Sequence, residues 1–161
     1  MTVLERMAAT SAVKRRLEDE AATGRLGAAI AAAMRPGDAI LLHGRYGAGK
    51  TTLARALIRA AAGDPRLVVP SPSFTLAQPY SLPSGVTLTH YDLWRVGEAD
   101  EIAELGWQEA REGIVVVEWP ERLGEAQPDD ALSVTLTAVP GEPLAREAVL
   151  EGWTGRLEGV A

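Results

Sequence analysis

The stretch AILLHGRYGAGKTTLARALIRA, residues 39–60, decides the fold that this chain adopts. The pattern G-x-x-x-x-G-K-T occupies residues 44–51 within it. An apolar run at 39–42 precedes the pattern, and apolar residues at helical spacing follow it at 53–61. Strand, glycine loop and helix in this order are the context that a phosphate-binding P-loop requires.

The chemistry of this loop suits a nucleotide. Its glycines let the backbone fold closely around an anion, so that backbone N–H groups and the helix N-terminus face the phosphates. Lys50 supplies a positive charge for the β- and γ-phosphates, and the Thr51 hydroxyl is a Mg²⁺ ligand. The chain has two lysines, Lys14 and Lys50, against fourteen arginines, so lysine is not its default cation. A glycine-rich turn with a surface lysine is the simpler alternative, but it does not account for the apolar strand before the loop or the helix after it. We expect the rest of the loop to line the nucleotide too: Gly44, Tyr46, Gly47, Ala48, Gly49 and Thr52.

Composition bounds the class of protein. A chain of 161 residues fits one domain, 1–161, and is long enough for a substantial core. It has no cysteine for disulfides, and its two histidines are too few for a structural zinc site. It shows neither an apolar run of ~20 residues nor the apolar region of a signal peptide, so we expect a cytoplasmic protein without a membrane partner. A net charge of −6 disfavours stable nucleic-acid binding by this chain alone, although contact with RNA within a larger complex stays open.

Hydrophobic patterns predict alternating strands and helices around the loop. Asp19 is the expected N-cap of a helix that ends near Met34, and the loop helix is expected to end near Ala62. The run Ile-Val-Val-Val at 114–117 is the most strand-like segment and is expected at the buried centre of the sheet. The other expected strands are 11–17, 67–69, 76–80, 86–91, 132–139 and 146–151, and the other expected helices are 98–112 in two pieces around Gly106, 121–126 as a helix or turn, and a short one within 152–161.

These elements predict an α/β fold of the P-loop NTPase type. We expect a three-layer sandwich with a mixed, mainly parallel central sheet. Residues 1–11 are expected to be loosely ordered, and residues 132–161 are expected to form a C-terminal hairpin and a short helix.

Two acidic residues follow predicted strands. Asp92 comes after the strand at 86–91, and Glu118 comes after the strand at 114–117. In a parallel sheet beside a P-loop, such positions suit a carboxylate that organises Mg²⁺ or one that orients the attacking water. Asp92 as the metal organiser with Glu118 as the water-orienting group is one assignment, and the reverse is the other. Position along the strands does not separate them.

The segment Ser-Pro-Ser-Phe-Thr at 71–75 has two interpretations. It is a rigid turn, because Pro72 fixes its own φ and restricts Ser71. Alternatively, it places a hydroxyl group near the γ-phosphate and Mg²⁺, as switch loops do. The sequence leaves these two interpretations balanced.

Several motifs in fixed order are similar to those of a known family. The segments HGRYGAGKTTLARAL, SPSFTL, HYDLWR, ELGW and VVVEWPERLG resemble the bacterial TsaE (YjeE) family of small P-loop ATPases. The resemblance, which runs from about Asp19 to Gly124, implies binding of ATP and Mg²⁺ and slow ATP hydrolysis. It also implies action on the TsaD–TsaB complex, which transfers threonylcarbamoyl to adenosine 37 of tRNA, so that tRNA is met only through that complex.

The same resemblance implies roles for individual residues. Lys50 and Thr51 bind phosphate and Mg²⁺, Asp92 organises Mg²⁺, and Glu118, a further metal-ligand candidate, is the catalytic carboxylate. Ser73 is the switch-like hydroxyl, and Trp119 lies beside the site. This chain departs from the family pattern at Arg45, where an acidic residue is usual, and at Ser73, where threonine is usual.

Other functions remain open. A small-molecule or nucleoside kinase needs an acceptor pocket and an arginine-rich lid, and no lid-like insertion is visible. A nucleotide sensor without turnover is a third possibility, whereas a GTPase is disfavoured because neither lysine lies in an N-K-x-D motif. Arg45 and Arg95 are the candidates for an arginine finger.

Overall fold

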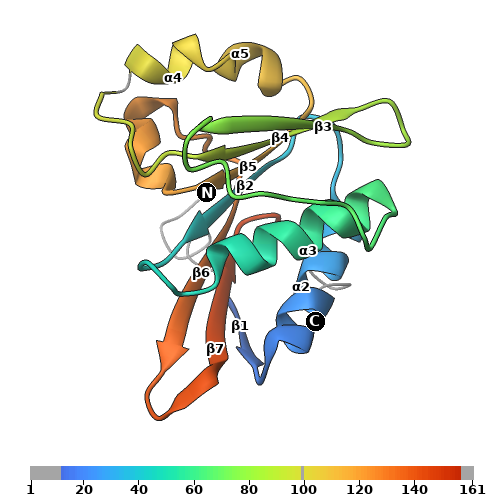
Figure 1. Cartoon of the computed structure of the whole chain (residues 1–161), viewed down its shortest axis with the longest axis vertical. Coiled ribbons are helices and arrows are strands. Elements are labelled where there is room, and N and C mark those ends of the chain that lie inside the picture. The colour runs from blue at the N-terminus through green and yellow to red at the C-terminus, as the bar shows by residue number, and fades with distance from the viewer. Residues whose placement is uncertain (1–11, 99, 157–161) are drawn as a thin grey trace, which may run out of the picture.

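One seven-stranded sheet organises the computed structural model, which describes residues 12–98 and 100–156 (Figure 1). Its order is β1-β7-β6-β2-β5-β4-β3. Strands β6, β2, β5 and β4 are parallel neighbours, and antiparallel strands extend both edges. The strands are β1 (Val13–Leu17), β2 (Ala39–His43), β3 (Ala77–Ser81), β4 (Thr87–Asp92), β5 (Ile114–Glu118), β6 (Leu132–Val139) and β7 (Glu142–Glu151).

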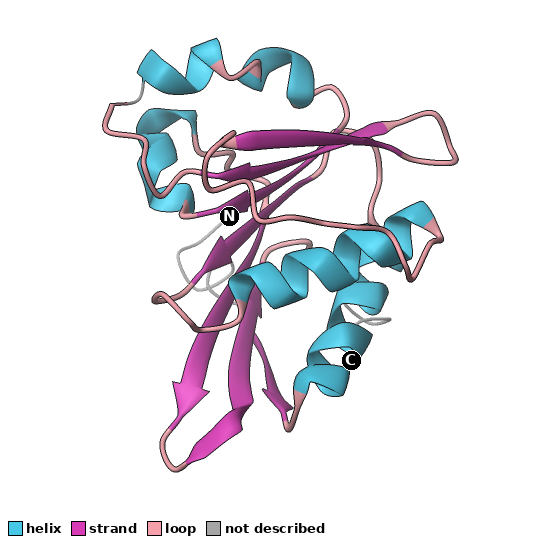
Figure 2. Ribbon diagram, in the orientation of Figure 1, coloured by secondary structure: helices cyan, strands magenta, loops and turns pink. Residues whose placement is uncertain are grey.

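Helices cover both faces of this sheet (Figure 2). The helices α2 (Glu20–Ala33) and α3 (Lys50–Ala62) pack on one face, where they share a core with Ile40 and Leu42 of β2. The other face packs against α4 (Asp100–Glu104), α5 (Trp107–Ala110) and the 3-10 helix η1 (Pro120–Ala126), through Ala39 and Leu41. Because alternate side chains of β2 are buried on opposite faces, this strand is apolar from Ala39 to Leu42. The predicted three-layer α/β sandwich is confirmed.

Several local predictions are also confirmed. The Asp19 side chain caps α2 by accepting a hydrogen bond from the Ala22 N–H at 2.9 Å. Gly63, in the left-handed conformation with φ 66°, ends α3. Gly106, also left-handed with φ 72°, separates α4 from α5. No helix within the described ranges has the length and apolar character needed to cross a membrane.

Three predicted elements are wrong or displaced. The segment at 67–69 is not a strand, because its carbonyls accept hydrogen bonds from arginines of α3 instead of a neighbouring strand. The hairpin partner of β6 begins at Glu142 and not at Arg146, with a register shift near Val139. Residues 152–156 form turns and no helix. The predictions for 1–11 and 157–161 fall outside the described residues.

Candidate functional site

The glycine loop connects the C-terminal end of β2 to the first turn of α3. Gly44, Gly47 and Gly49 have φ values of 151°, 81° and 103°, which side chains rarely allow. A Cβ atom at Gly44 would also lie 2.8 Å from the Leu136 carbonyl oxygen of β6. Only glycine therefore lets the chain turn here with β6 so close.

Lys50 is held inside this loop. Its side chain is buried, and its ammonium group donates hydrogen bonds to the carbonyl oxygens of Gly44 at 2.6 Å and Arg45 at 3.0 Å. The same Nζ lies 4.2 Å from the centre of a Trp119 ring. Burial lowers the pKa of Lys50, while nearby carboxylates, Glu118 first among them, oppose this shift. The ammonium is thus preorganised beside the loop.

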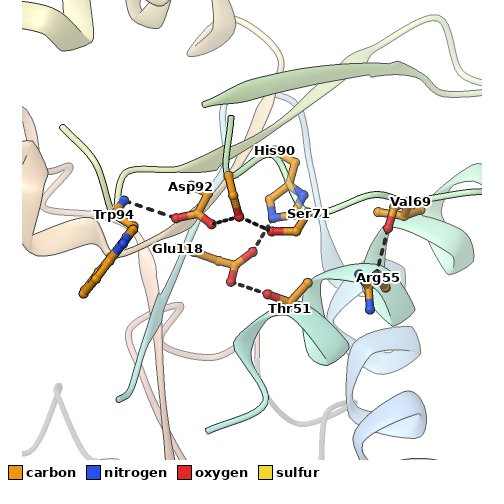
Figure 3. Close-up of polar contacts among 9 residues, drawn as sticks. Thr51, Arg55, Val69, Ser71, His90, Asp92, Trp94 and Glu118 are labelled. Carbon is orange, nitrogen blue, oxygen red and sulfur yellow. Dashed lines mark hydrogen bonds and ion pairs between the residues drawn. The ribbon is translucent and has the colours of Figure 1, made fainter. Parts of the chain in front are cut away.

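A chain of hydrogen bonds links α3 to β5 and β4 (Figure 3). The Thr51 hydroxyl donates to Glu118 Oε1 at 2.7 Å, and Glu118 Oε2 lies 2.7 Å from His90 Nε2. Glu118 and His90 are 2% and 0% exposed, so both carboxylate oxygens find their partners in the interior.

Asp92 lies beside Glu118 in the same layer. The two residues are paired in the parallel register of β4 and β5. Asp92 Oδ1 accepts from the Trp94 N–H at 3.1 Å, and Oδ2 lies 3.4 Å from the Ser73 hydroxyl, which contacts Ser71 at 2.9 Å. Burial raises the pKa of Asp92, and the Glu118 charge adds to this, although the bonds from Trp94 and Ser73 oppose it. The 71–75 segment therefore does bring a hydroxyl to the carboxylates.

These groups open into one cleft of about 490 Å³. Most of the predicted site residues line it: Tyr46, Gly47, Gly49, Lys50, Thr51, Thr52, Ser73, Asp92, Glu118 and Trp119. Gly44 and Ala48 lie instead on the other side of the loop, where they line a second hollow against β6 together with Arg45. Neither Arg45 nor Arg95 lines the cleft, and the Arg95 guanidinium lies 4.8 Å from the Phe74 ring.

Sequence reasoning missed several site residues, among them Trp94, which lines the cleft, and three with basic side chains. Arg55 lines the cleft from α3, and the signal was its position four residues after Thr51, one helical turn away. Arg146 lines the cleft from β7 and donates to the Ala48 carbonyl oxygen at 2.9 Å, a contact across 98 residues with no local signal. His90 could have been found, because in a strand it faces the same side as Asp92 two residues later.

Trp119 adopts an unusual backbone conformation next to Glu118. Its φ is 58°, in the left-handed region that a bulky residue rarely occupies, and Pro120 follows it. Its ring packs against Trp94, with ring centres 4.6 Å apart. Strain of this kind concentrates at functional sites, where the surrounding structure maintains it.

The fold and the site together define a class: an α/β protein of the P-loop type, with its glycine loop between a central parallel strand and a helix. Residues 17–147 match the family model described as "Threonylcarbamoyl adenosine biosynthesis protein TsaE". The chain belongs to the TsaE family.

Individual relatives agree with this membership. A Rickettsia conorii protein described as "tRNA threonylcarbamoyladenosine biosynthesis protein TsaE" is 36% identical over 124 residues, or 76% of this chain and 70% of that protein. An Aquifex aeolicus protein of the same description is 41% identical over 106 residues, or 66% of this chain and 75% of that protein. The crystal structure of Bacillus subtilis YdiB is similar with a TM-score of 0.71 and 26% identity, covering 94% of this chain and 92% of that one.

Proposed function

We propose that this chain binds ATP with Mg²⁺ in the cleft beside the glycine loop and hydrolyses it slowly. We further propose that this ATPase serves the formation of threonylcarbamoyladenosine in tRNA. One observation carries the proposal: Lys50, Thr51, Asp92 and Glu118 line a single cleft at the C-terminal edge of the parallel strands. That edge is where open α/β sheets bind their ligands.

Lys50 and the loop bind the triphosphate. The Lys50 ammonium is hydrogen-bonded to loop carbonyls, which are weaker partners than phosphate oxygens. When ATP binds, the ammonium exchanges these partners for β- and γ-phosphate oxygens, where it stabilises the charge that develops during hydrolysis.

Glu118 acts on the attacking water. The carboxylate orients a water molecule in line with the γ-phosphorus and accepts its proton as the new P–O bond forms and the bond to the β-phosphate oxygen breaks. Thr51, Asp92 and Glu118 supply the hard oxygen atoms that Mg²⁺ prefers, and Mg²⁺ when bound neutralises charge on the phosphates. The residues fit such an ion, because the Thr51 hydroxyl lies 2.7 Å from a Glu118 oxygen in the same cleft that Asp92 lines.

The isolated protein is expected to turn over slowly. Arg55 and Arg146 line the cleft, but the Nε of each is bonded to a backbone carbonyl, of Val69 and Ala48 respectively. We expect hydrolysis at about 10⁻⁴ to 10⁻² s⁻¹, the range of P-loop enzymes before a partner completes the site. We propose that this partner is the TsaD–TsaB complex and that tRNA is contacted only through it.

The test compares single variants for ATP binding and phosphate release with no acceptor added. Lys50→Ala should abolish ATP binding, whereas Lys14→Ala, at the exposed other lysine, on β1, should not. Glu118→Gln should bind ATP with Mg²⁺ but retain only a small residual rate of hydrolysis, and Asp92→Asn should lose the effect of Mg²⁺ on binding. An exchange of the last two phenotypes would reverse the roles of the two acids, and unchanged binding by Lys50→Ala would refute the nucleotide proposal.

The partner is tested separately by affinity capture from a bacterial lysate. Wild-type protein with ATP and Mg²⁺ should retain the TsaD–TsaB complex, and Lys50→Ala should retain less of it. Equal capture by both proteins, or none by either, would contradict a nucleotide-dependent partnership.

A further inference from the structure

His90 is a completely buried polar side chain next to the proposed catalytic carboxylate. It lies on β4 two residues before Asp92, so both side chains face α3. Its Nε2 is 2.7 Å from Glu118 Oε2, and its side chain is 0% exposed. It does not line the cleft, so it touches the chemistry only through Glu118.

The two ring nitrogens of His90 have different surroundings. His90 Nδ1 is buried and has no hydrogen-bond partner among the described residues. A carboxylate oxygen can only accept, so Nε2 must carry the hydrogen that lies between the two groups. His90 Nε2–H is therefore the donor to Glu118 Oε2.

We propose that His90 is a positioning residue for Glu118, an inference that rests on the proposed ATPase function. The Nε2–H group occupies Oε2, so the carboxylate is held in one orientation with Oε1 facing Thr51 and the cleft. Without this donor, Oε2 is a buried acceptor without a partner, and the carboxylate rotates away from the position from which it orients the water.

Removing the His90 contact should affect the rate of hydrolysis but not nucleotide binding. Outer partners of this kind typically change activity by about 10- to 100-fold when they are removed. His90→Phe should therefore lower kcat by about that factor, whereas the ATP affinity measured without Mg²⁺ stays as in the wild type. His90→Gln places an amide N–H near the position of Nε2 and should recover much of the loss. Thr89→Val is the matched control, because Thr89 is buried in the same strand but faces the opposite side.

A double-mutant cycle tests the route of the effect. If His90 acts through Glu118, then His90→Phe should have no further effect on hydrolysis in a Glu118→Gln background. Additive losses in the double variant, or a kcat unchanged by His90→Phe alone, would overturn the proposal. A general loss of packing would instead lower the stability and the ATP affinity of His90→Phe itself relative to Thr89→Val.

A second measurement does not depend on activity or on the folding of any His90 variant. The chain has two histidines, so imidazole ¹⁵N NMR with His43→Gln assigns the His90 ring. We expect a hydrogen on Nε2, and an Nε2–H resonance that moves in Glu118→Gln. A ring without hydrogen on Nε2, or no response to Glu118→Gln, would refute the positioning role. If the wild type fails to hydrolyse ATP while this signature is present, the proposed function fails and the contact stands.

Discussion

The contact between α2 and α3 seats the helix that carries Lys50 and Thr51, and it can be tested at Gly27. A Cβ atom at Gly27 would lie 2.8 Å from Ala56 Cβ and 2.8 Å from the Leu57 backbone nitrogen. Overpacking costs about 1–3 kcal/mol, and a backbone atom cannot turn aside, so the upper end applies. Alanine also gains about 1 kcal/mol of helix propensity over glycine. Gly27→Ala should therefore lower the free energy of unfolding by about 2 kcal/mol.

The matched variant is Gly24→Ala in the same helix. A Cβ atom there meets nothing within 4 Å, so this variant should gain the propensity of about 1 kcal/mol. The helix propensity cancels between the two variants, and their difference of about 3 kcal/mol is the cost of the clash alone. In thermal unfolding, the midpoint temperatures of Gly27→Ala and Gly24→Ala should differ by about 6–12 °C. Urea unfolding should give the same difference in the free energy of unfolding. Equal stabilities would show that α2 and α3 do not approach at this distance.

Three other measurements address separate parts of the molecule. Burial lowers the pKa of His43 below 6.5, so the unfolded chain takes up the proton at a higher pH than the folded protein does. The free energy of unfolding should therefore fall as the pH drops through 6.5. His43→Gln should lose this part of the pH dependence of unfolding. Arg156 binds both carboxylate oxygens of Asp38, at 3.1 and 2.7 Å, so Arg156→Gln should cost about 1–3 kcal/mol in urea unfolding, and no change would show that this pairing is not stabilising. The Trp119 ring lies over the Lys50 ammonium, so ATP should change the intrinsic fluorescence, and Trp119→Phe should remove most of that change; a full signal in the variant would place the reporter elsewhere.

Features that depend on neighbouring residues were predictable from the sequence. The strand and helix around Lys50 follow from the local spacing of apolar residues, and the loop follows from the glycines of the G-x-x-x-x-G-K-T pattern. The cap at Asp19 and the breaks at Gly63 and Gly106 are also local, since each depends on one side chain or one backbone angle. The apolar segment 114–117 indicated a central strand, because a strand without polar side chains must be buried on both faces.

Features that depend on distant contacts were not predictable in the same way. The segment at 67–69 has strand-like composition, but Arg55 and Arg59 bind its carbonyls at 2.8 and 2.9 Å and keep it along α3. Residues 152–156 have no helix because Gly152, with φ 100°, packs against Ala131, where a Cβ atom would lie 2.4 Å from the carbonyl oxygen. Such contacts carry no local period, so a pattern along the chain cannot reveal them.

Strand register explains why the two acids share one site. Glu118 is paired with Asp92 on one side and with Leu42, just before the glycine loop, on the other. Side chains alternate between the faces, so a slip of one residue between β4 and β5 would pair Glu118 with Tyr91 or Leu93, which both belong to the opposite core. Burial of those two side chains therefore fixes the placement of the carboxylates. Asp92 and Glu118 are themselves buried away from water, so each carboxylate must find hydrogen-bond donors inside the protein. Those donors fix the direction in which each carboxylate points.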